Sequence, residues 1–261
     1  MVWTDPASDS RSRLALLSQS ARDWALFLDV DGTLLDIAER PHLVQVPPPL
    51  IHDLERVSKS LEGALALVSG RAIAWIDSAF RPLRLPVAGQ HGAEIRLSAD
   101  APVAIDQTID LGAVRARIQP IETVDGIEIE DKGLAIAVHY RRARNRAAAR
   151  AAIADALADL GEDLEVLPGR LVYEVKARAI NKGTAVGRLA EAGAFSGRMP
   201  VYFGDDQTDE YAFREVLARG GIAVQVGPSP APAGCLWLDS PGETRRWLAG
   251  LFARAPESAD A

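Results

Sequence analysis

The sequence predicts an α/β fold, with a Rossmann-like parallel sheet core and an inserted mixed α/β domain. Near both ends of the chain, short apolar runs alternate with amphipathic helical patterns, which is typical of a parallel sheet covered on both faces. In the middle, apolar and polar residues alternate, as in antiparallel strands with one wet face. The length of 261 residues and the hydrophobic content of 48% suit one large domain or two smaller ones. We therefore expect a core domain at residues 1–105 and 181–261, and an insert at 106–180.

The first part of the predicted core holds two strand–helix units. The apolar run ALFLDV at residues 25–30 is too short for a buried helix and predicts a strand. Residues 47–63 predict a helix ending at Gly63, because one helical face carries Leu50, Leu54, Val57 and Leu61. Residues 64–71, ALALVSGR, predict the next strand, and a helical pattern follows with Ile73, Ile76 and Phe80.

The insert is expected to contain two hairpins around a helix. Residues 124–142 alternate about the turn sequence Asp131-Lys132-Gly133. The Ala- and Arg-rich segment 143–161 predicts a helix, and residues 164–177 alternate again about a Pro168-Gly169 turn.

The strand–helix rhythm returns near the end of the chain. Residues 199–206, 221–227 and 235–240 predict strands, and residues 208–221 predict a helix with Phe213, Val216 and Leu217 inward. A last helix is expected from Pro241, where Ser240 and Glu243 have the spacing of a capping box.

Charge and composition exclude several classes of protein. The net charge of −7 and the pI of about 5.2 disfavour nucleic-acid binding. The single cysteine, Cys235, excludes an internal disulfide and suits a reducing compartment. No run approaches the roughly 18 apolar residues of a membrane span. The polar N-terminus lacks the pattern of a signal peptide, so we expect a cytoplasmic protein with a loose N-terminal arm and a disordered tail, RAPESADA.

Four short stretches fall where an open parallel sheet binds ligands, past the carboxyl ends of its strands. They are DVDGT (29–33), SGR (69–71), NKG (181–183) and GDDQTDE (204–210). Each alone has an ordinary structural explanation, such as an acidic turn, a helix start, a solvated lysine or a helix cap. Their combination and order favour a single site.

Clustered aspartates at this edge point to a cation. Asp29, Asp31, Asp205 and Asp206 would repel one another, and a divalent ion such as Mg²⁺ relieves this repulsion. A metal held by Asp29 and Asp205 leaves Asp29 a second oxygen that can attack phosphorus. Asp31 can protonate the leaving alkoxide and then deprotonate the water that hydrolyses the aspartyl-phosphate.

Other residues of the four stretches suit the phosphate. Ser69 and the amides of Gly70 and Arg71 offer donors for phosphate oxygens, and Lys182 adds a positive charge against the phosphate and the nucleophile.

The motifs DVDGTL, SGR, KG and GDDQTDE, in this order, resemble the haloacid dehalogenase superfamily of aspartyl-phosphate phosphatases. The resemblance implies that Asp29 is the nucleophile and Asp31 the acid/base. It places the metal on Asp29, the backbone carbonyl of Asp31 and Asp205, with Asp206 and Asp209 as supporting candidates. It also implies that Ser69 binds phosphate and that Lys182 is the lysine of the third motif.

Within that superfamily the chain resembles trehalose-6-phosphate phosphatases over about residues 20 to 250. The resemblance rests on GQHGAE (89–94), IEDKGLAIAVHYR (129–141), GRLVYEVKA (169–177) and FGDDQTDE (203–210). It implies a mixed α/β cap that supplies sugar contacts from Glu130, Lys132, Arg141, Arg170 and Glu174, with His91 bordering the site. Arg170 departs from the lysine found in some members.

The residues of the insert agree with a sugar ligand. A neutral disaccharide offers hydroxyl groups, to which charged side chains make strong hydrogen bonds. Glu130 and Lys132 fall on one side of an extended segment, as do Glu174 and Lys176. The structural alternative is a solvated strand face with cross-strand ion pairs. We leave Lys176 open between the two roles and expect His139 to be structural.

The expected activity is a Mg²⁺-dependent hydrolysis of trehalose 6-phosphate, a small-molecule substrate, to trehalose and phosphate. Sister phosphatases acting on sucrose phosphate or mannosyl-phosphoglycerate, and a phosphomutase, are the enzymatic alternatives. The non-enzymatic alternative is a regulatory partner of a trehalose-phosphate synthase, which the intact Asp29, Asp31, Lys182 and Asp205 disfavour. We expect a monomer, and association with such a synthase stays open.

Overall fold

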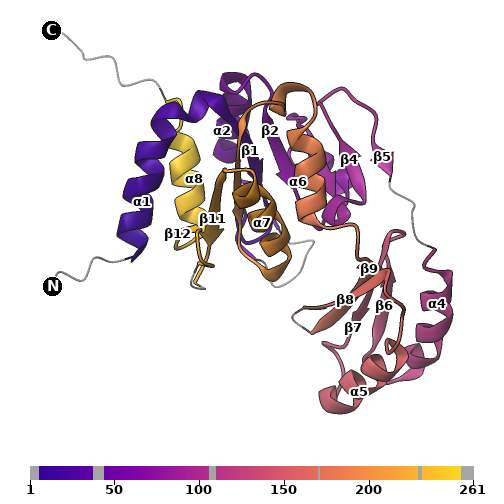
Figure 1. The fold of residues 1–261 in the computed structure, drawn as a ribbon. Coiled ribbons are helices and arrows are strands. Elements are labelled where there is room, and N and C mark those ends of the chain that lie inside the picture. The colour runs from indigo at the N-terminus through magenta and orange to yellow at the C-terminus, as the bar shows by residue number, and fades with distance from the viewer. Residues whose placement is uncertain (1–5, 38–43, 106–109, 170, 229–230, 254–261) are drawn as a thin grey trace, which may run out of the picture. The chain divides into compact units, whose positions relative to one another are not determined.

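The computed structural model describes residues 6–37, 44–105, 110–169, 171–228 and 231–253 (Figure 1). The chain divides into two compact units. The first contains residues 1–104 and 182–261, and the second contains residues 105–181. The predicted fold class, a largely parallel α/β core with an inserted α/β segment, is confirmed.

An eight-stranded sheet forms the centre of the first unit, with the order β12-β11-β10-β1-β2-β3-β4-β5. From β12 to β3 neighbouring strands are parallel, and β4 is antiparallel to β3. The strands are β1 (Trp24–Leu28), β2 (Leu65–Val68), β3 (Val87–Gly89), β4 (Glu94–Arg96), β5 (Ala104–Ile105), β10 (Met199–Gly204), β11 (Ile222–Val226) and β12 (Leu236–Leu238). The central strand β1 is buried throughout its length, which explains its continuous apolar sequence.

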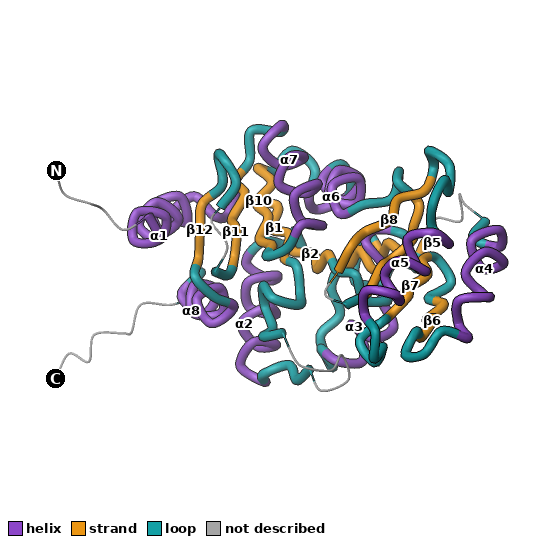
Figure 2. The backbone as a smooth tube through the Cα atoms, turned by 90° about the horizontal axis from the view of Figure 1, so that it is seen from below, coloured by secondary structure: helices purple, strands orange, loops and turns teal. Residues whose placement is uncertain are grey.

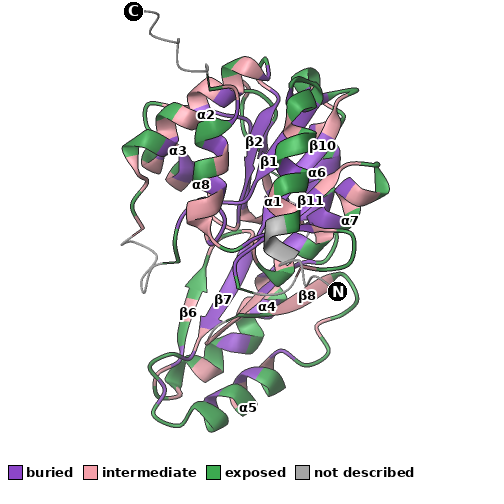
Figure 3. Cartoon of the chain, turned by 90° about the vertical axis from the view of Figure 1, so that its left-hand side faces the viewer, coloured by how far each residue is buried: buried purple, intermediate pink, exposed green. Residues whose placement is uncertain are grey.

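Helices cover both faces of this sheet, as Figure 2 shows, with α6 and α7 on one face and α2 and α8 on the other. Their bounds are α2 (Pro48–Ser60), α3 (Ile73–Ala79), α6 (Lys182–Ala190), α7 (Glu210–Ala218) and α8 (Pro241–Gly250). The predicted apolar faces of α2 and α7 are buried at Leu50, Leu54, Val57, Phe213 and Val216. Figure 3 shows the resulting core as a continuous buried layer along β1, β2 and β10.

The expectation of a loose N-terminal arm is wrong for residues 6–23. They form the helix α1 (Pro6–Leu17) and a 3₁₀ segment (Ser18–Asp23) beside β12. Leu14 is buried in the core, and Arg11 pairs with Asp239 and Glu243 at 2.9 and 2.8 Å. Buried apolar area and these long-range ion pairs hold a segment whose own sequence carries a weak helical pattern.

Two predicted local features also differ from the structure. The Ser240 side chain makes no cap hydrogen bond to α8, and the Glu243 carboxylate instead accepts from the Asp239 amide at 3.0 Å. Pro168 and Gly169 lie inside a strand rather than in a turn. Gly169 pairs with Val172 of the next strand, so the chain reverses direction between these two residues. Leu171, with φ 64°, takes the left-handed conformation there.

The second unit packs helices on one face of a four-stranded antiparallel sheet of order β6-β7-β9-β8. Its elements are α4 (Gly112–Ile118), β6 (Glu128–Asp131), β7 (Ala135–His139), α5 (Arg146–Ala156), β8 (Leu164–Gly169) and β9 (Val172–Ala177). The predicted hairpin about Gly133 (φ 82°) and the predicted helix, capped by Asn145, are both present. Alternate strand residues Ile136, Val138 and Val175 form the apolar core beneath the helices.

In the part of the chain that the structure describes, no helix is long and apolar enough to cross a membrane. The predicted disordered tail at 254–261 lies outside the described residues.

A buried arginine ties α3 to the sheet. The Arg96 guanidinium on β4 is fully buried and makes two hydrogen bonds of 2.7 Å to the Asp77 carboxylate on α3. It also donates to the Leu85 carbonyl at 2.8 Å. Hydrogen bonds and charge from Arg96 outweigh partial burial and hold the pKa of Asp77 below its usual value.

We predict that Asp77→Asn lowers the free energy of unfolding by about 3 kcal/mol, because it leaves a buried guanidinium without its counter-ion. Because folding lowers the pKa of Asp77, the ion pair of the wild type contributes its full stability at pH values above the usual carboxyl pKa. This stability is lost as the pH falls through the lower pKa of Asp77 in the folded state. Urea unfolding at pH 7 and near pH 3 measures this. A difference between variant and wild type that is as large at pH 3 as at pH 7 would contradict the ion-pair assignment.

Candidate active site

The carboxyl ends of three neighbouring parallel strands bring the predicted motifs together. Asp29 follows β1, Ser69 follows β2 and Asp205 follows β10, and β1 lies between the other two strands. The Asp29 amide continues the ladder by donating to the Phe203 carbonyl at 2.9 Å. Asp29 and Ser69 are almost completely buried. Water therefore solvates the Asp29 carboxylate poorly.

The turn after Asp29 requires a glycine. Gly32 has φ +88°, and a Cβ atom on it would lie 2.0 Å from Oδ2 of Asp205. Any side chain would therefore displace the Asp205 carboxylate. The hydroxyl of the neighbouring Thr33 donates to Oδ1 of Asp205 at 3.5 Å.

Lys182 enters the site as the first residue of α6. Its ammonium group is buried and lies 2.7 Å from Oδ1 of Asp29 and 2.6 Å from Oδ1 of Asp209. Burial favours the neutral amine, but the charges of Asp209 and Asp29 outweigh it and raise the pKa of Lys182 well above its usual value. The lysine is thus a fixed positive charge beside Asp29.

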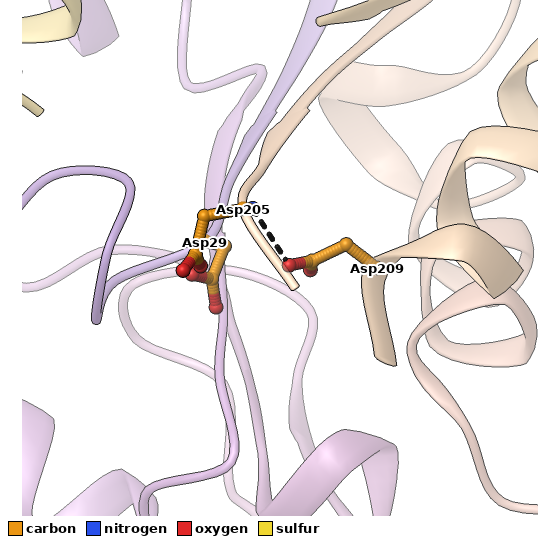
Figure 4. Close-up of side chains that lie close together, drawn as sticks. All are labelled: Asp29, Asp205 and Asp209. Atoms are coloured by element: carbon orange, nitrogen blue, oxygen red, sulfur yellow. Dashed lines mark hydrogen bonds between the residues drawn. The ribbon is translucent and has the colours of Figure 1, made fainter. Parts of the chain in front are cut away.

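Asp209 organises the acidic loop. Its Oδ1 accepts from Lys182 and from the Tyr202 hydroxyl at 2.5 Å, and its Oδ2 accepts from the amides of Asp205 and Asp206 at 2.9 and 3.0 Å. Figure 4 shows the Asp209 side chain reaching the Asp205 backbone from the side opposite Asp29. Four donors occupy this one carboxylate, which leaves Asp209 a supporting role.

Three carboxylates lie close enough to share a cation. Ligand oxygens of Asp29, Asp205 and Asp209 fall within 4.8 Å of one another. Oδ2 of Asp29 is buried and has no hydrogen-bond partner among the described residues. Burial, and then repulsion from neighbouring aspartates, raise the pKa of Asp29 and bring the pKa of Asp205 to about 7. An oxygen-seeking divalent cation fits this donor set, because it would neutralise both carboxylates.

Asp31 and Asp206 make other contacts in this structure. The Asp31 carboxylate receives two hydrogen bonds from the Arg71 guanidinium, at 2.5 and 2.6 Å, and that guanidinium stacks on the Trp75 ring at 3.8 Å. Oδ1 of Asp206 accepts from the amide and hydroxyl of Thr208 and caps the turn that leads into α7. The metal and acid/base roles expected for these two residues stay predictions.

The SGR loop is braced by the QHG turn at residues 90–92. The Ser69 hydroxyl accepts from the Arg71 amide at 3.2 Å, and the Ser69 carbonyl accepts from the His91 amide at 2.9 Å. A Cβ atom on Gly70 would lie 2.7 Å from Nε2 of His91, so the imidazole packs directly on this glycine. His91 therefore does lie beside the candidate phosphate loop. The phosphate-binding roles of Ser69, Gly70 and Arg71 stay predictions.

In the second unit, the sheet face without helices carries the residues expected to bind sugar. Lys132 pairs with Glu174 at 2.7 Å, and Glu130 lies 2.9 Å from His139. The sequence predicts a structural role for His139. Arg141 is exposed just beyond β7, and Arg170 lies outside the described residues.

Lys176, left open between sugar contact and structure, is buried. Its ammonium group lies 3.2 Å from Glu165 and donates to the carbonyls of Ile180 and Ala177 at 2.5 and 3.4 Å. These contacts favour a structural role for Lys176.

Sequence reasoning missed two residues that support the acidic loop. Tyr202 lies inside the predicted strand 199–206 and was given no role there, although a buried tyrosine hydroxyl needs a hydrogen-bond partner. Gln225, on β11, donates from Nε2 to the Asp205 carbonyl at 2.7 Å. A glutamine inside a buried strand was the available signal.

The fold and site define the class of the chain. Its structure superimposes on the C-terminal domain of a C. albicans trehalose-6-phosphate phosphatase with a TM-score of 0.78, 23% identity, and coverage of 92% of this chain and 97% of the other. It also superimposes on a haloacid dehalogenase-like hydrolase from B. subtilis with a TM-score of 0.65, 16% identity, and coverage of 87% and 99%. The chain therefore has the haloacid dehalogenase fold.

Sequence comparison gives the family. A family model described as trehalose-phosphatase matches residues 27–233. A Sinorhizobium fredii protein named "Probable trehalose-phosphate phosphatase" is 42% identical over 84% of this chain and 83% of its own length. The Escherichia coli trehalose-6-phosphate phosphatase is 35% identical over 80% of each chain. The chain belongs to the trehalose-phosphatase family.

We predict that Tyr202→Phe lowers kcat about tenfold and leaves KM nearly unchanged, because loss of the hydroxyl loosens Asp209 and hence Lys182 and the Asp205 loop. The free energy of unfolding should fall by about 2 kcal/mol, as for a hydrogen bond to a charged group. Steady-state kinetics and urea unfolding measure both effects.

Tyr211→Phe is the matched control, since Tyr211 lies on α7 with its ring against Arg214. An unchanged kcat in Tyr202→Phe, or an equal loss in Tyr211→Phe, would rule out this positioning role.

Proposed function

We propose that the chain hydrolyses trehalose 6-phosphate to trehalose and phosphate, the last step of trehalose biosynthesis, through an aspartyl-phosphate on Asp29. Membership of the trehalose-phosphatase family and the activity named for its relatives support the reaction. The observation that carries the mechanism is the asymmetry of Asp29. Lys182 holds one carboxylate oxygen at 2.7 Å, while the other is buried and makes no hydrogen bond to any described residue.

Asp29 is proposed as the nucleophile. Its unbonded oxygen attacks phosphorus, the bond from phosphorus to O6 of the sugar breaks, and an acyl phosphate forms on the carboxylate. The charge of Lys182 favours the ionised form of the attacking carboxylate and, with donors from Ser69, Gly70 and Arg71, balances the charge of the phosphate oxygens.

Asp31 is proposed to carry the proton. It protonates the leaving oxygen of trehalose and then accepts a proton from the water that hydrolyses the acyl phosphate, which regenerates Asp29. In this structure Arg71 holds the Asp31 carboxylate at 2.5 and 2.6 Å. The proposed step therefore requires Asp31 to leave Arg71 when substrate binds.

We propose Mg²⁺ as the cofactor, held by the carboxylates of Asp29 and Asp205 with the backbone carbonyl of Asp31, and with Asp206 as a further candidate. When bound, the ion supplies positive charge that offsets the clustered carboxylates and the phosphate. The raised pKa values of Asp29 and Asp205 support a cation at this point.

Sugar recognition is proposed for the helix-free face of the second unit, from Glu130, Lys132 and Glu174. Arg141 and, from its sequence position alone, Arg170 are further proposed substrate-binding residues, and His91 is proposed as one beside the phosphate loop of the first unit. The Lys132–Glu174 ion pair and the Glu130–His139 contact on that face present polar groups that can exchange partners with sugar hydroxyls. The cytoplasmic location and the monomeric state expected from the sequence stay predictions.

We predict that a phosphate-release panel of trehalose 6-phosphate, sucrose 6-phosphate, mannosyl-phosphoglycerate and glucose 6-phosphate gives the highest kcat/KM with trehalose 6-phosphate. Recognition of the second sugar ring should separate it from glucose 6-phosphate by about 100-fold or more. Asp29→Asn, which keeps the side-chain shape, should release no phosphate while its circular dichroism matches wild type. Equal rates with trehalose 6-phosphate and glucose 6-phosphate would refute disaccharide specificity.

We predict that Mg²⁺ raises the Tm of the wild-type chain by about 5 °C when present in large excess, because it binds the folded carboxylate cluster. Asp205→Asn should lose this shift, and EDTA should remove both the shift and the wild-type turnover. Asp36→Asn, which changes an exposed aspartate paired with Arg245 on the surface, is the matched control and should keep the shift. A shift of the same size in Asp205→Asn would place the ion elsewhere.

A further inference from the structure

The Lys132–Glu174 ion pair spans two strand spacings. Lys132, just after β6, donates its amide to the Ala135 carbonyl of β7 at 2.9 Å, whereas Glu174 on β9 is the register partner of Ala137. Strand β7 therefore lies between the two charged residues. Neighbouring strands are about 4.8 Å apart, so the pair crosses roughly 10 Å of sheet. The 2.7 Å contact between the two side chains therefore passes over β7.

The residues beneath this crossing are alanines. Ala135 and Ala137 point to the helix-free face, because Ile136 and Val138 between them pack into the core of the second unit. Ala135 is 3% exposed and Ala137 is fully covered. Residues 135–138, AIAV, thus alternate small side chains on the charged face with large ones on the core face. Core packing does not explain the small residues.

Ala137 is flanked by carboxylates on both sides. Its register partners are Glu130 on β6 and Glu174 on β9, so both glutamates emerge on the same face one strand away from the methyl group. Glu130 contacts His139 and Glu174 contacts Lys132. Because the Ala137 side chain is only a methyl group, these charged side chains can occupy the space above β7.

We propose that Ala137, supported by Ala135, is a specificity-determining position for sugar recognition. Its methyl-sized side chain lets the Lys132–Glu174 pair cross β7 close to the sheet and keeps the carboxylates of Glu130 and Glu174 spaced for hydroxyl groups. A branched side chain at 137 would fill that gap, lift the ion pair and turn the flanking carboxylates outward. The inference rests on the proposed function, since it concerns the same substrate.

The test compares trehalose 6-phosphate with p-nitrophenyl phosphate, which carries no sugar. Ala137→Val should lower kcat/KM for trehalose 6-phosphate about tenfold or more, chiefly through KM, and leave p-nitrophenyl phosphate within about twofold of wild type. Valine favours strands, so lost strand propensity does not account for the change. Glu174→Gln should give a similar loss, and the double variant should lose little more than either single variant.

Ala151→Val is the matched control, because Ala151 is exposed on α5 in the same unit and should leave both substrates unchanged. If Ala137→Val does not fold, Ala135→Val tests the same gap beside Lys132, with circular dichroism and p-nitrophenyl phosphate turnover reporting the fold. If Ala137→Val kept wild-type kinetics with trehalose 6-phosphate, or lost equal activity on both substrates, the inference about Ala137 would be overturned. Either result would leave the proposed function standing. A wild-type chain that turns over p-nitrophenyl phosphate and not trehalose 6-phosphate would overturn the proposed function as well.

Discussion

The buried ammonium group of Lys182 is the contact on which the site depends. It lies between Asp29 and Asp209, at 2.7 and 2.6 Å, and all three groups are removed from water. Buried carboxylates this close would repel one another without a cation. Through Asp209 the same contact reaches Tyr202 and the backbone of Asp205 and Asp206, so one lysine orders Asp29 and the acidic loop together.

Glycines make this crowding possible. The positions facing Asp205 and Asp209 are Gly32 and Gly204, where a Cβ atom would lie 2.0 and 2.3 Å from those carboxyl groups. The helix-free face of the second unit uses alanine in a similar way, beneath the Lys132–Glu174 pair. In both units, small residues leave room for long-range contacts between charged side chains.

Much of the fold and site followed from local pattern. The strand at Trp24–Leu28, the apolar face of α2 and the hairpin about Gly133 were predictable, because burial on both faces, a helical period and a glycine turn each leave a sequence signature. The N-terminal helix was not predictable. Its packing depends on Leu14 entering a distant core and on Arg11 reaching Asp239 and Glu243, more than 200 residues away.

The sequence by itself determined the parallel core, the order of the four motifs and the resemblance to a phosphatase family, because these depend on residue types and spacing along the chain. The tertiary structure decided which contacts each acidic residue makes. Asp209 is occupied by four donors, Asp31 is held by Arg71, and Asp29 keeps one oxygen without a described partner. Spacing along a chain does not reveal which carboxylate a distant lysine, tyrosine or arginine will reach, since such contacts form only when separate strands and helices meet.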